Sequence, residues 1–373
     1  MKNQEDINIG ALKELRTRFF NIPAERLGRD AVKSYSIAME NELRTIFGQT
    51  DENGKGFTLI SVGGFGRREL CYGSDIDFMI LSTRIKKKHA YALNNKLSDL
   101  LWRAGLSVGS SVRTISECIE ESKDVTVMVN LIDSRFIAGD KKLYEKYSKK
   151  VLNYIVCRNK KHLMQTLVDE VEKRRLKYPD NYISEPDLKE GVGTLRDYNT
   201  ICWINKITPI KILISDMTEE DYVLLSKKLA DAIDFIFRIR NVVNMRTQKD
   251  NCLRFDLQED IAELLGYGRS DEACVELMRQ FFEHSLFIEN SLDTIMGIIG
   301  EGKRKNKING IFYMDGHYLE SDSEGLELLS TANCLDAVVF WFLVRYQLDI
   351  GARLRQFLIT ESHKKRMNRN NPS

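Results

Sequence analysis

Residues 57–82 read Phe57-Thr-Leu-Ile-Ser-Val-Gly-Gly-Phe-Gly-Arg-Arg-Glu-Leu-Cys-Tyr-Gly-Ser-Asp-Ile-Asp-Phe-Met-Ile-Leu-Ser82. The apolar run over 57–62 predicts a strand, which the glycine pair at 63–64 ends. We expect a short helix over 65–70 and a second strand over 75–82. This order of strand, glycine pair, short helix and strand decides the fold, and the rest of the sequence is interpreted around it.

Two aspartates mark the start of the second predicted strand. Because residues i and i+2 of a strand point to the same face, Asp75 and Asp77 project together, away from Ile76 and Phe78. Adjacent carboxylates repel each other and are costly to desolvate unless a divalent cation binds between them. Hard oxygen ligands suit Mg²⁺, which takes its remaining ligands from water and substrate phosphates. An Asp-x-Asp alone is more often a solvated strand end, so the pair needs its context.

The glycine pair supplies that context. Gly63 and Gly64 allow the backbone to approach a phosphate closely, and the helix that follows presents free N–H groups and its positive dipole end. The glycine spacing fits neither the Rossmann fingerprint nor the Walker motif, which requires a lysine. An anion cradle beside a metal pair predicts a nucleotidyltransferase fold that binds a nucleoside triphosphate.

The flanking sequence predicts an α+β protein in four parts. We expect them at residues 1–49 (two helices broken at Pro23), 50–150 (the nucleotidyltransferase domain, a mixed sheet with flanking helices), 151–302 (a helical-bundle domain) and 303–373. Within the second part we expect a helix over 88–104 and further strands over 106–114 and 127–137. Within the fourth we expect a charged linker over 303–307, a hairpin over 308–319, helices over 324–360 and a basic tail from 364.

The composition excludes several classes of protein. The 373 residues carry 56 Lys plus Arg and 54 Asp plus Glu, and the net charge of +2 gives no support to a general nucleic-acid binder. No apolar run approaches the ~20 residues of a membrane span, and the N-terminus has no signal-peptide pattern. The seven cysteines include no C-x-x-C pair, and the five histidines form no H-E-x-x-H motif. These features predict a reduced, cytoplasmic protein that does not enter a membrane.

Five stretches follow one another with the order and spacing of a known family over about residues 55–300. They are Gly63-Gly-Phe-Gly-Arg-Arg-Glu-Leu with Ser74-Asp-Ile-Asp, Val108-Gly-Ser-Ser-Val-Arg-Thr114, Asn130-Leu-Ile-Asp-Ser-Arg-Phe-Ile-Ala-Gly-Asp140, Lys189-Glu-Gly-Val-Gly-Thr-Leu-Arg-Asp197 and Arg254-Phe-Asp-Leu-Gln258. The sequence thereby resembles the bacterial PII signal-protein uridylyltransferase/uridylyl-removing enzymes, within the polymerase-beta-type nucleotidyltransferase superfamily.

The resemblance implies a Mg²⁺-dependent transfer of UMP from UTP to a tyrosine hydroxyl of a PII-type signal protein, with Mn²⁺ as an alternative metal. Asp75 and Asp77 take the catalytic, metal-binding positions. The superfamily usually adds a third carboxylate from a neighbouring strand to help activate the attacking hydroxyl, and Asp133 is the candidate. A salt bridge from Asp133 to Arg113 or Arg135 is the alternative interpretation.

Further residues fall at or near the family's nucleotide site. In the first motif these are Gly63, Gly64, Arg67 and Ser74, and in the later motifs they are Arg113, Lys189, Arg196 and Asp197. The arginines of the later motifs are candidates for phosphate contacts, although each could instead pair with a local carboxylate. Asp197 lies in a polar loop of the kind that concentrates binding residues, but it could equally cap the next helix.

The chain departs from the family pattern at three positions. The family usually has histidine where this chain has Ser110, glycine where it has Thr194, and arginine where it has Cys252. None of these positions touches the metal pair, so we expect the chemistry to be intact while the identity of the substrate stays open.

The family enzymes continue into an HD-type phosphohydrolase domain, which removes UMP, and into paired ACT domains, which sense glutamine. This sequence ends about where the hydrolase would begin, so it is either a fragment or a naturally short protein. Two other functions stay open. One is a nucleotidyltransferase that acts on RNA or a small molecule, and the other is a non-catalytic regulator that binds a partner through the helical domain.

Overall fold

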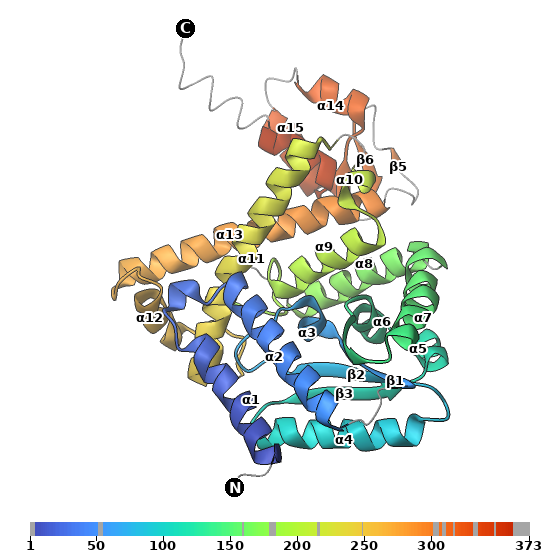
Figure 1. Ribbon diagram of the computed structural model, residues 1–373. Coiled ribbons are helices and arrows are strands. Elements are labelled where there is room, and N and C mark those ends of the chain that lie inside the picture. The colour runs from blue at the N-terminus through green and yellow to red at the C-terminus, as the bar shows by residue number, and fades with distance from the viewer. Residues whose placement is uncertain are drawn as a thin grey trace.

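A four-stranded mixed sheet carries the glycine motif and the two aspartates (Figure 1). Its strands are β1 (Phe57–Ser61), β2 (Ile76–Ser82), β3 (Val108–Arg113) and β4 (Arg135–Gly139), in the order β3-β2-β1-β4. Strand β1 is antiparallel to both of its neighbours, whereas β2 and β3 are parallel, with Asp77 opposite Gly109. All residues of β1 are buried, so this strand lies inside the core and the aspartates begin the strand beside it.

The computed structural model describes most of the chain. The described residues are 4–50, 55–158, 160–178, 184–214, 217–247, 249–300, 306–307, 311–315, 318–330, 335–346 and 348–360. The tail from 364 and residues 303–305 of the expected linker lie outside them.

Two helices border the central strands. Helix α3 (Gly63–Arg67) follows β1 and begins at the glycine pair, two residues before the predicted start. Helix α4 (Lys87–Arg103) buries Leu93, Leu97, Leu100 and Leu101, whose spacing forms one apolar face. Figure 1 shows α4 on one side of the sheet and α6 (Val125–Ile132) and α7 (Lys141–Tyr147) on the other, so helices cover both faces.

The strand expected over 127–137 is wrong in its first half. Residues Val125–Ile132 form helix α6, and β4 begins only at Arg135. The Asp124 carboxylate accepts hydrogen bonds from the backbone N–H groups of Thr126 and Val127, which caps the helix. The helix buries Met128, Val129, Leu131 and Ile132, so packing and the cap outweigh the strand preference of the valines.

The N-terminal and central helices share one apolar core with the sheet. The N-terminal elements are α1 (Gln4–Phe20), η1 (Ala24–Arg26) and α2 (Arg29–Thr50). After α5 (Ile115–Glu121) and β4, the helical region comprises α7 (Lys141–Tyr147), the π-helical turns η2 (Ser148–Leu152) and η3 (Tyr154–Arg158), α8 (Lys160–Lys177), α9 (Leu195–Ile207), α10 (Ile210–Leu213), α11 (Glu219–Thr247), α12 (Phe255–Leu264) and α13 (Asp271–Gly300). The domain boundaries placed near 49, 150 and 302 stay predictions, and the shared core crosses the first two.

The C-terminal elements form a second, smaller core around Phe312, Leu319, Leu329, Val339 and Leu354. They are β5 (Asn306–Lys307), β6 (Tyr313–Asp315), β7 (Tyr318–Glu320), α14 (Ser323–Ser330), α15 (Leu335–Tyr346), β8 (Asp349–Ile350) and a helical stretch over 352–360. The antiparallel pairing of β6 with β7 confirms the expected hairpin.

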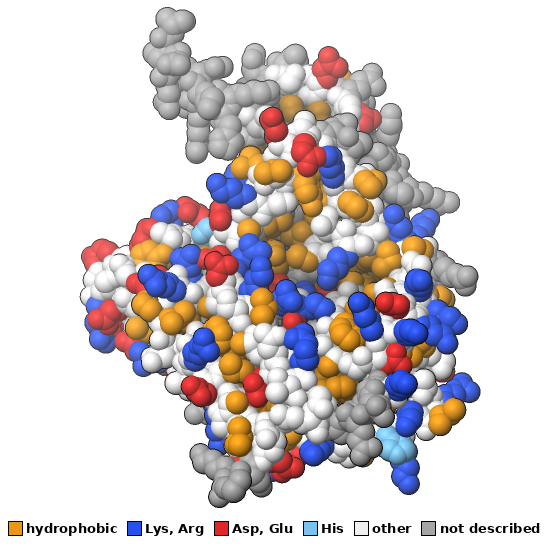
Figure 2. All heavy atoms as spheres, viewed as in Figure 1, with side chains coloured by type: hydrophobic (Ala, Val, Ile, Leu, Met, Phe, Trp, Pro, Cys, Tyr) orange, Lys and Arg blue, Asp and Glu red, His pale blue; other side chains and the backbone are white. Residues whose placement is uncertain are grey.

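The α+β class, with a mixed sheet followed by a helical region, is confirmed. Figure 2 shows basic, acidic and apolar side chains interspersed over one face, in keeping with the near-neutral charge. In the described part of the chain, no helix is both long and apolar enough to cross a bilayer.

Candidate active site

Asp75 and Asp77 lie at the N-terminal end of β2, where the backbone is fixed on both sides. The Ile76 N–H donates to the Ser107 carbonyl at 2.8 Å, and the Val62 N–H donates to the Asp77 carbonyl at 3.0 Å. The Asp75 side chain is 57% exposed, whereas Asp77 is only partly exposed. The predicted pair therefore forms at the edge of the core, with one carboxylate outside and one further in.

Two glycines leave the room that the Asp77 side chain occupies. A Cβ on Gly63, whose φ is +55°, would lie 3.2 Å from Asp77 Oδ2 and 2.8 Å from Asn130 Oδ1. A Cβ on Gly109, directly across the parallel ladder, would overlap Asp77 Oδ1. Glycine at these two positions leaves space for the Asp77 carboxylate, and the missing side chain would also let a phosphate approach the backbone.

The Asp77 carboxylate lies in an environment that disfavours its charge. Burial and the neighbouring Asp75 carboxylate raise the pKa of Asp77 to about 6, while the Lys189 and Arg67 charges act in the opposite direction. A divalent cation between the two carboxylates would offset this repulsion, so the residues fit Mg²⁺. Within the described residues, no three His, Cys, Asp or Glu side chains gather around one position, which leaves the other ligand places to water and phosphate oxygens.

Asp133 is held in a separate, buried network. Its carboxylate accepts hydrogen bonds from Arg67 Nη1 at 2.5 Å, Trp203 Nε1 at 2.8 Å and Lys206 Nζ at 2.6 Å, and its side chain is fully buried. Asp133 therefore links the turn between α6 and β4 to α9 in this structure, and its role as a third carboxylate stays a prediction. The expected salt bridge exists, but its partners are Arg67 and Lys206 in place of Arg113 or Arg135.

Three predicted nucleotide contacts, Arg67, Ser74 and Arg113, bond to groups within the protein, and their contact with a nucleotide stays a prediction. Arg67 bonds Glu69 as well as Asp133, and its guanidinium lies 5.6 Å from the centre of the Trp203 ring. The Ser74 hydroxyl accepts from the Cys71 N–H and closes the turn before β2. Arg113 bonds Glu121 at 2.6 Å, opposite Leu81 near the far end of β2.

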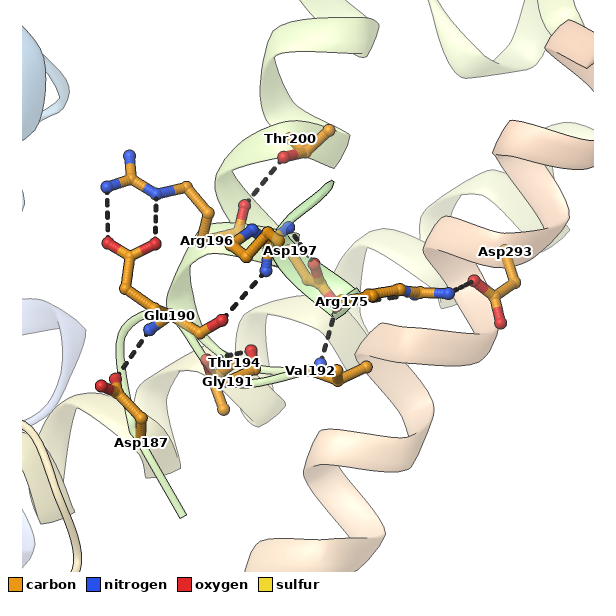
Figure 3. A network of polar contacts seen from close by, with 12 residues as sticks. Arg175, Asp187, Glu190, Gly191, Val192, Thr194, Arg196, Asp197, Thr200 and Asp293 are labelled. Atoms are coloured by element: carbon orange, nitrogen blue, oxygen red, sulfur yellow. Dashed lines mark hydrogen bonds and ion pairs between the residues drawn. The ribbon is translucent and has the colours of Figure 1, made fainter. Parts of the chain in front are cut away.

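The 189–197 motif forms a braced loop at the start of α9 (Figure 3). Arg196 and Glu190 form a two-point ion pair, with N···O distances of 3.2 and 2.8 Å. The buried Asp197 carboxylate lies in the first turn of α9, whose N-cap residue is Thr194, and accepts from Arg174 and from the Gly193 N–H. Among the four residues predicted in the later motifs, only Lys189 acts on the aspartate pair, through its charge.

The three residues that depart from the family pattern lie outside the Asp75–Asp77 pair. Ser110 bonds Asn94 and Ser98 of α4, on the face of β3 that does not carry Gly109. The Thr194 hydroxyl donates to the Gly191 carbonyl within the braced loop. Cys252 pairs with Asp187 in an isolated bridge, which joins the loop before α9 to the segment after α11.

Sequence reasoning missed Lys249, whose Nζ lies 3.2 Å from Asp75 Oδ1. It stands 174 residues away along the chain, and no spacing rule connects the two. The nearest feature noted in the sequence is Cys252, which departs from the family pattern and lies three residues after Lys249.

Comparisons with known proteins point to one family. A family model described as GlnD PII-uridylyltransferase matches residues 162–296. The relatives include the bifunctional uridylyltransferase/uridylyl-removing enzyme of Pseudomonas entomophila, 33% identical over 276 residues, which are 72% of this chain and 31% of the relative. This chain resembles the PII-uridylyltransferase family.

Two further relatives carry the same name. The protein of Idiomarina loihiensis is 33% identical over 61% of this chain and 27% of its own length. The protein of Zymomonas mobilis is 27% identical over 79% of this chain and 33% of its own length. The chain thus spans about a third of the length of the curated relatives it matches. The predicted resemblance to this family is confirmed.

Proposed function

We propose that this protein is a Mg²⁺-dependent uridylyltransferase, which moves UMP from UTP to a tyrosine hydroxyl of a PII-type signal protein. The observation that carries the proposal is the Asp75–Asp77 pair, whose inner carboxylate sits between two glycines with its pKa raised to about 6. The names of the relatives support uridylyl transfer. We also propose that the protein acts in the cytoplasm, where the free thiols of the described cysteines stay reduced.

The proposed reaction exchanges a phosphoanhydride bond of UTP for a phosphodiester bond to the acceptor. The tyrosine oxygen bonds to the α-phosphorus of UTP, and the bond from that phosphorus to the oxygen bridging to the β-phosphate breaks. The electron pair leaves with pyrophosphate, and the hydroxyl proton passes to water. Asp75 and Asp77 hold Mg²⁺, or Mn²⁺ in its place. The bound ion supplies Lewis-acid stabilisation of charge on the phosphate oxygens.

We propose the remaining nucleotide contacts from the exposure of each residue and from the weakness of its contacts within the protein. A Cβ on Gly64 would have no neighbour closer than 3.9 Å, so the backbone there is open to a phosphate. The Lys189 side chain is 41% exposed, and its ammonium is 3.8 Å from Glu190, which leaves it able to turn to an anion. We propose Gly63, Gly64 and Lys189 as the nucleotide contacts, and Arg67, Asp133 and Asp197 as supports of the site.

The test incubates the purified protein with Mg²⁺ and each nucleoside triphosphate in turn, together with a PII-type protein or with RNA. Mass spectrometry should detect one UMP on the PII-type protein with UTP. Modification of RNA alone would overturn the proposed acceptor. Binding of a PII-type protein without any nucleotide transfer would overturn the enzyme assignment and favour a non-catalytic regulator.

Replacing Asp77 by Asn tests the metal pair. We expect the transfer rate to fall by at least about 10³-fold, because the stabilisation lost with the ion amounts to several kcal/mol. Asp99→Asn, at an exposed position on α4, is the control and should keep full activity. Retention of activity in Asp77→Asn would place the chemistry elsewhere.

A further inference from the structure

The helical region reaches the aspartate pair through a two-stranded clasp, which we define as residues 186–188 and 251–253. The Leu188 N–H donates to the Asn251 carbonyl at 2.8 Å, and the Leu253 N–H donates to the Pro186 carbonyl at 2.9 Å. Lys249 lies two residues before this clasp and Lys189 one residue after its first strand. The clasp thus brings two lysines to the two carboxylates from a part of the chain far from β2.

The backbone around Lys249 is well fixed. The Thr247 hydroxyl donates to the Val243 carbonyl and accepts from the Asp250 N–H at 3.2 Å. The Asp250 carboxylate in turn accepts from the Cys252 N–H at 3.0 Å. Arg240 of α11 holds the Asn251 side chain at 2.9 Å. The end of α11 and the clasp therefore direct Lys249 to one place.

The Lys249 ammonium occupies the outer side of Asp75. Its Nζ is 3.2 Å from Asp75 Oδ1 and also donates to the Ser107 hydroxyl. The two charged side chains are 54% and 57% exposed, so the ion pair is weak and easily exchanged for another partner. An ammonium and a divalent cation compete for the same carboxylate oxygen, because both are held by its negative charge.

We propose that Lys249 exchanges partners with the occupancy of the site: it pairs with Asp75 when no nucleotide is bound and contacts a phosphate oxygen when the metal–nucleotide complex enters. This inference rests on the proposed function. A Lys249 ammonium released from Asp75 is left beside a polyanion, which offers it a stronger partner than an exposed carboxylate. Lys249 thereby weakens metal binding without nucleotide and strengthens nucleotide binding.

The test measures two affinities of the full chain with Lys249→Met and Lys249→Arg. Mn²⁺ binding without nucleotide is followed by electron paramagnetic resonance, and UTP binding at saturating Mg²⁺ by calorimetry. Lys249→Met should bind Mn²⁺ about three- to fivefold more tightly, since it loses the competing cation, and UTP about tenfold more weakly. Lys249→Arg should stay close to the wild type in both measurements. Lys211→Met, which removes a lysine paired with Glu219 elsewhere, is the control and should change neither.

The two changes in opposite directions are the signature that a merely structural lysine would not produce. If Lys249→Met weakens both affinities or changes neither, while the wild type still binds UTP and transfers UMP, the inference is overturned and the proposed function stands. If the wild type binds no nucleoside triphosphate with Mg²⁺, the proposed function fails and the inference fails with it.

Discussion

Asp77 lies beside the first residue of α3 and Asp133 beside its penultimate residue, and the two carboxylates have opposite surroundings. Gly63, the first residue of α3, makes room for the Asp77 side chain, and Gly66 makes room for the Asp133 carbonyl, with which a Cβ would overlap. Asp133 receives three donors, two of them cationic. No donor to the Asp77 carboxylate is found among the described residues, and its pKa is raised.

These surroundings distinguish Asp133, a carboxylate that stabilises the fold, from Asp77, a carboxylate that we propose binds a cation. A buried charge stabilises the folded state only when its partners compensate the loss of water. Asp133 meets that condition and joins the end of α6 to α9. Asp77 does not meet it, so its charge opposes folding and is retained for another purpose, which we assign to metal binding.

The largest expected effect is on stability, from Asp133→Asn. Removing this charge leaves the Arg67 guanidinium, which is 11% exposed, without one of its two carboxylate partners, and it weakens the Lys206 contact. Breaking a buried pair by removing one partner costs about 3–5 kcal/mol, so we expect a loss in that range in urea unfolding. The matched variant is Asp77→Asn, which should be as stable as the wild type or more stable. Equal destabilisation by both variants would contradict the distinction between the two carboxylates.

Much of the fold follows from sequence patterns, and the main error has a physical cause. The strand, glycine pair and second strand are local features, so periodicity finds them. The run over 125–132 is apolar and partly β-branched, and such a run does not distinguish a buried strand from a short buried helix. Asp124, in the N-cap position, was the signal that would have favoured the helix.

The candidate site also has residues that local sequence patterns place together and residues that they do not. Asp75 and Asp77 are two residues apart on one strand, and the i, i+2 rule places them together. The partners of Asp133 lie about 70 residues away on α9, and Lys249 is 174 residues from Asp75. Only tertiary packing brings these groups together, so local patterns predicted neither the partners of Asp133 nor the position of Lys249.

A smaller effect is expected from Gly109→Ala, which tests the space around Asp77. The new Cβ would overlap Asp77 Oδ1 and displace the carboxylate. Both aspartate side chains would still be present. Because small misplacements of reacting groups can cost about 10²-fold, we expect a loss of that size in transfer rate. Gly10→Ala, on α1 with nothing near its Cβ, is the control and should keep full activity. Full activity of Gly109→Ala would show that the exact seat of Asp77 is unimportant.

The smallest effect is expected from Trp203→Phe, which asks whether charge alone holds Asp133. The change removes one neutral donor, 2.8 Å from Asp133 Oδ2, and keeps an aromatic ring beside Arg67. A neutral hydrogen bond contributes about 1 kcal/mol, so we expect that loss in urea unfolding with the transfer rate unchanged. A cost as large as that of Asp133→Asn would mean that the indole positions the whole network. In that case the two cations would be secondary, and the contrast between Asp133 and Asp77 would rest on packing more than on compensated charge.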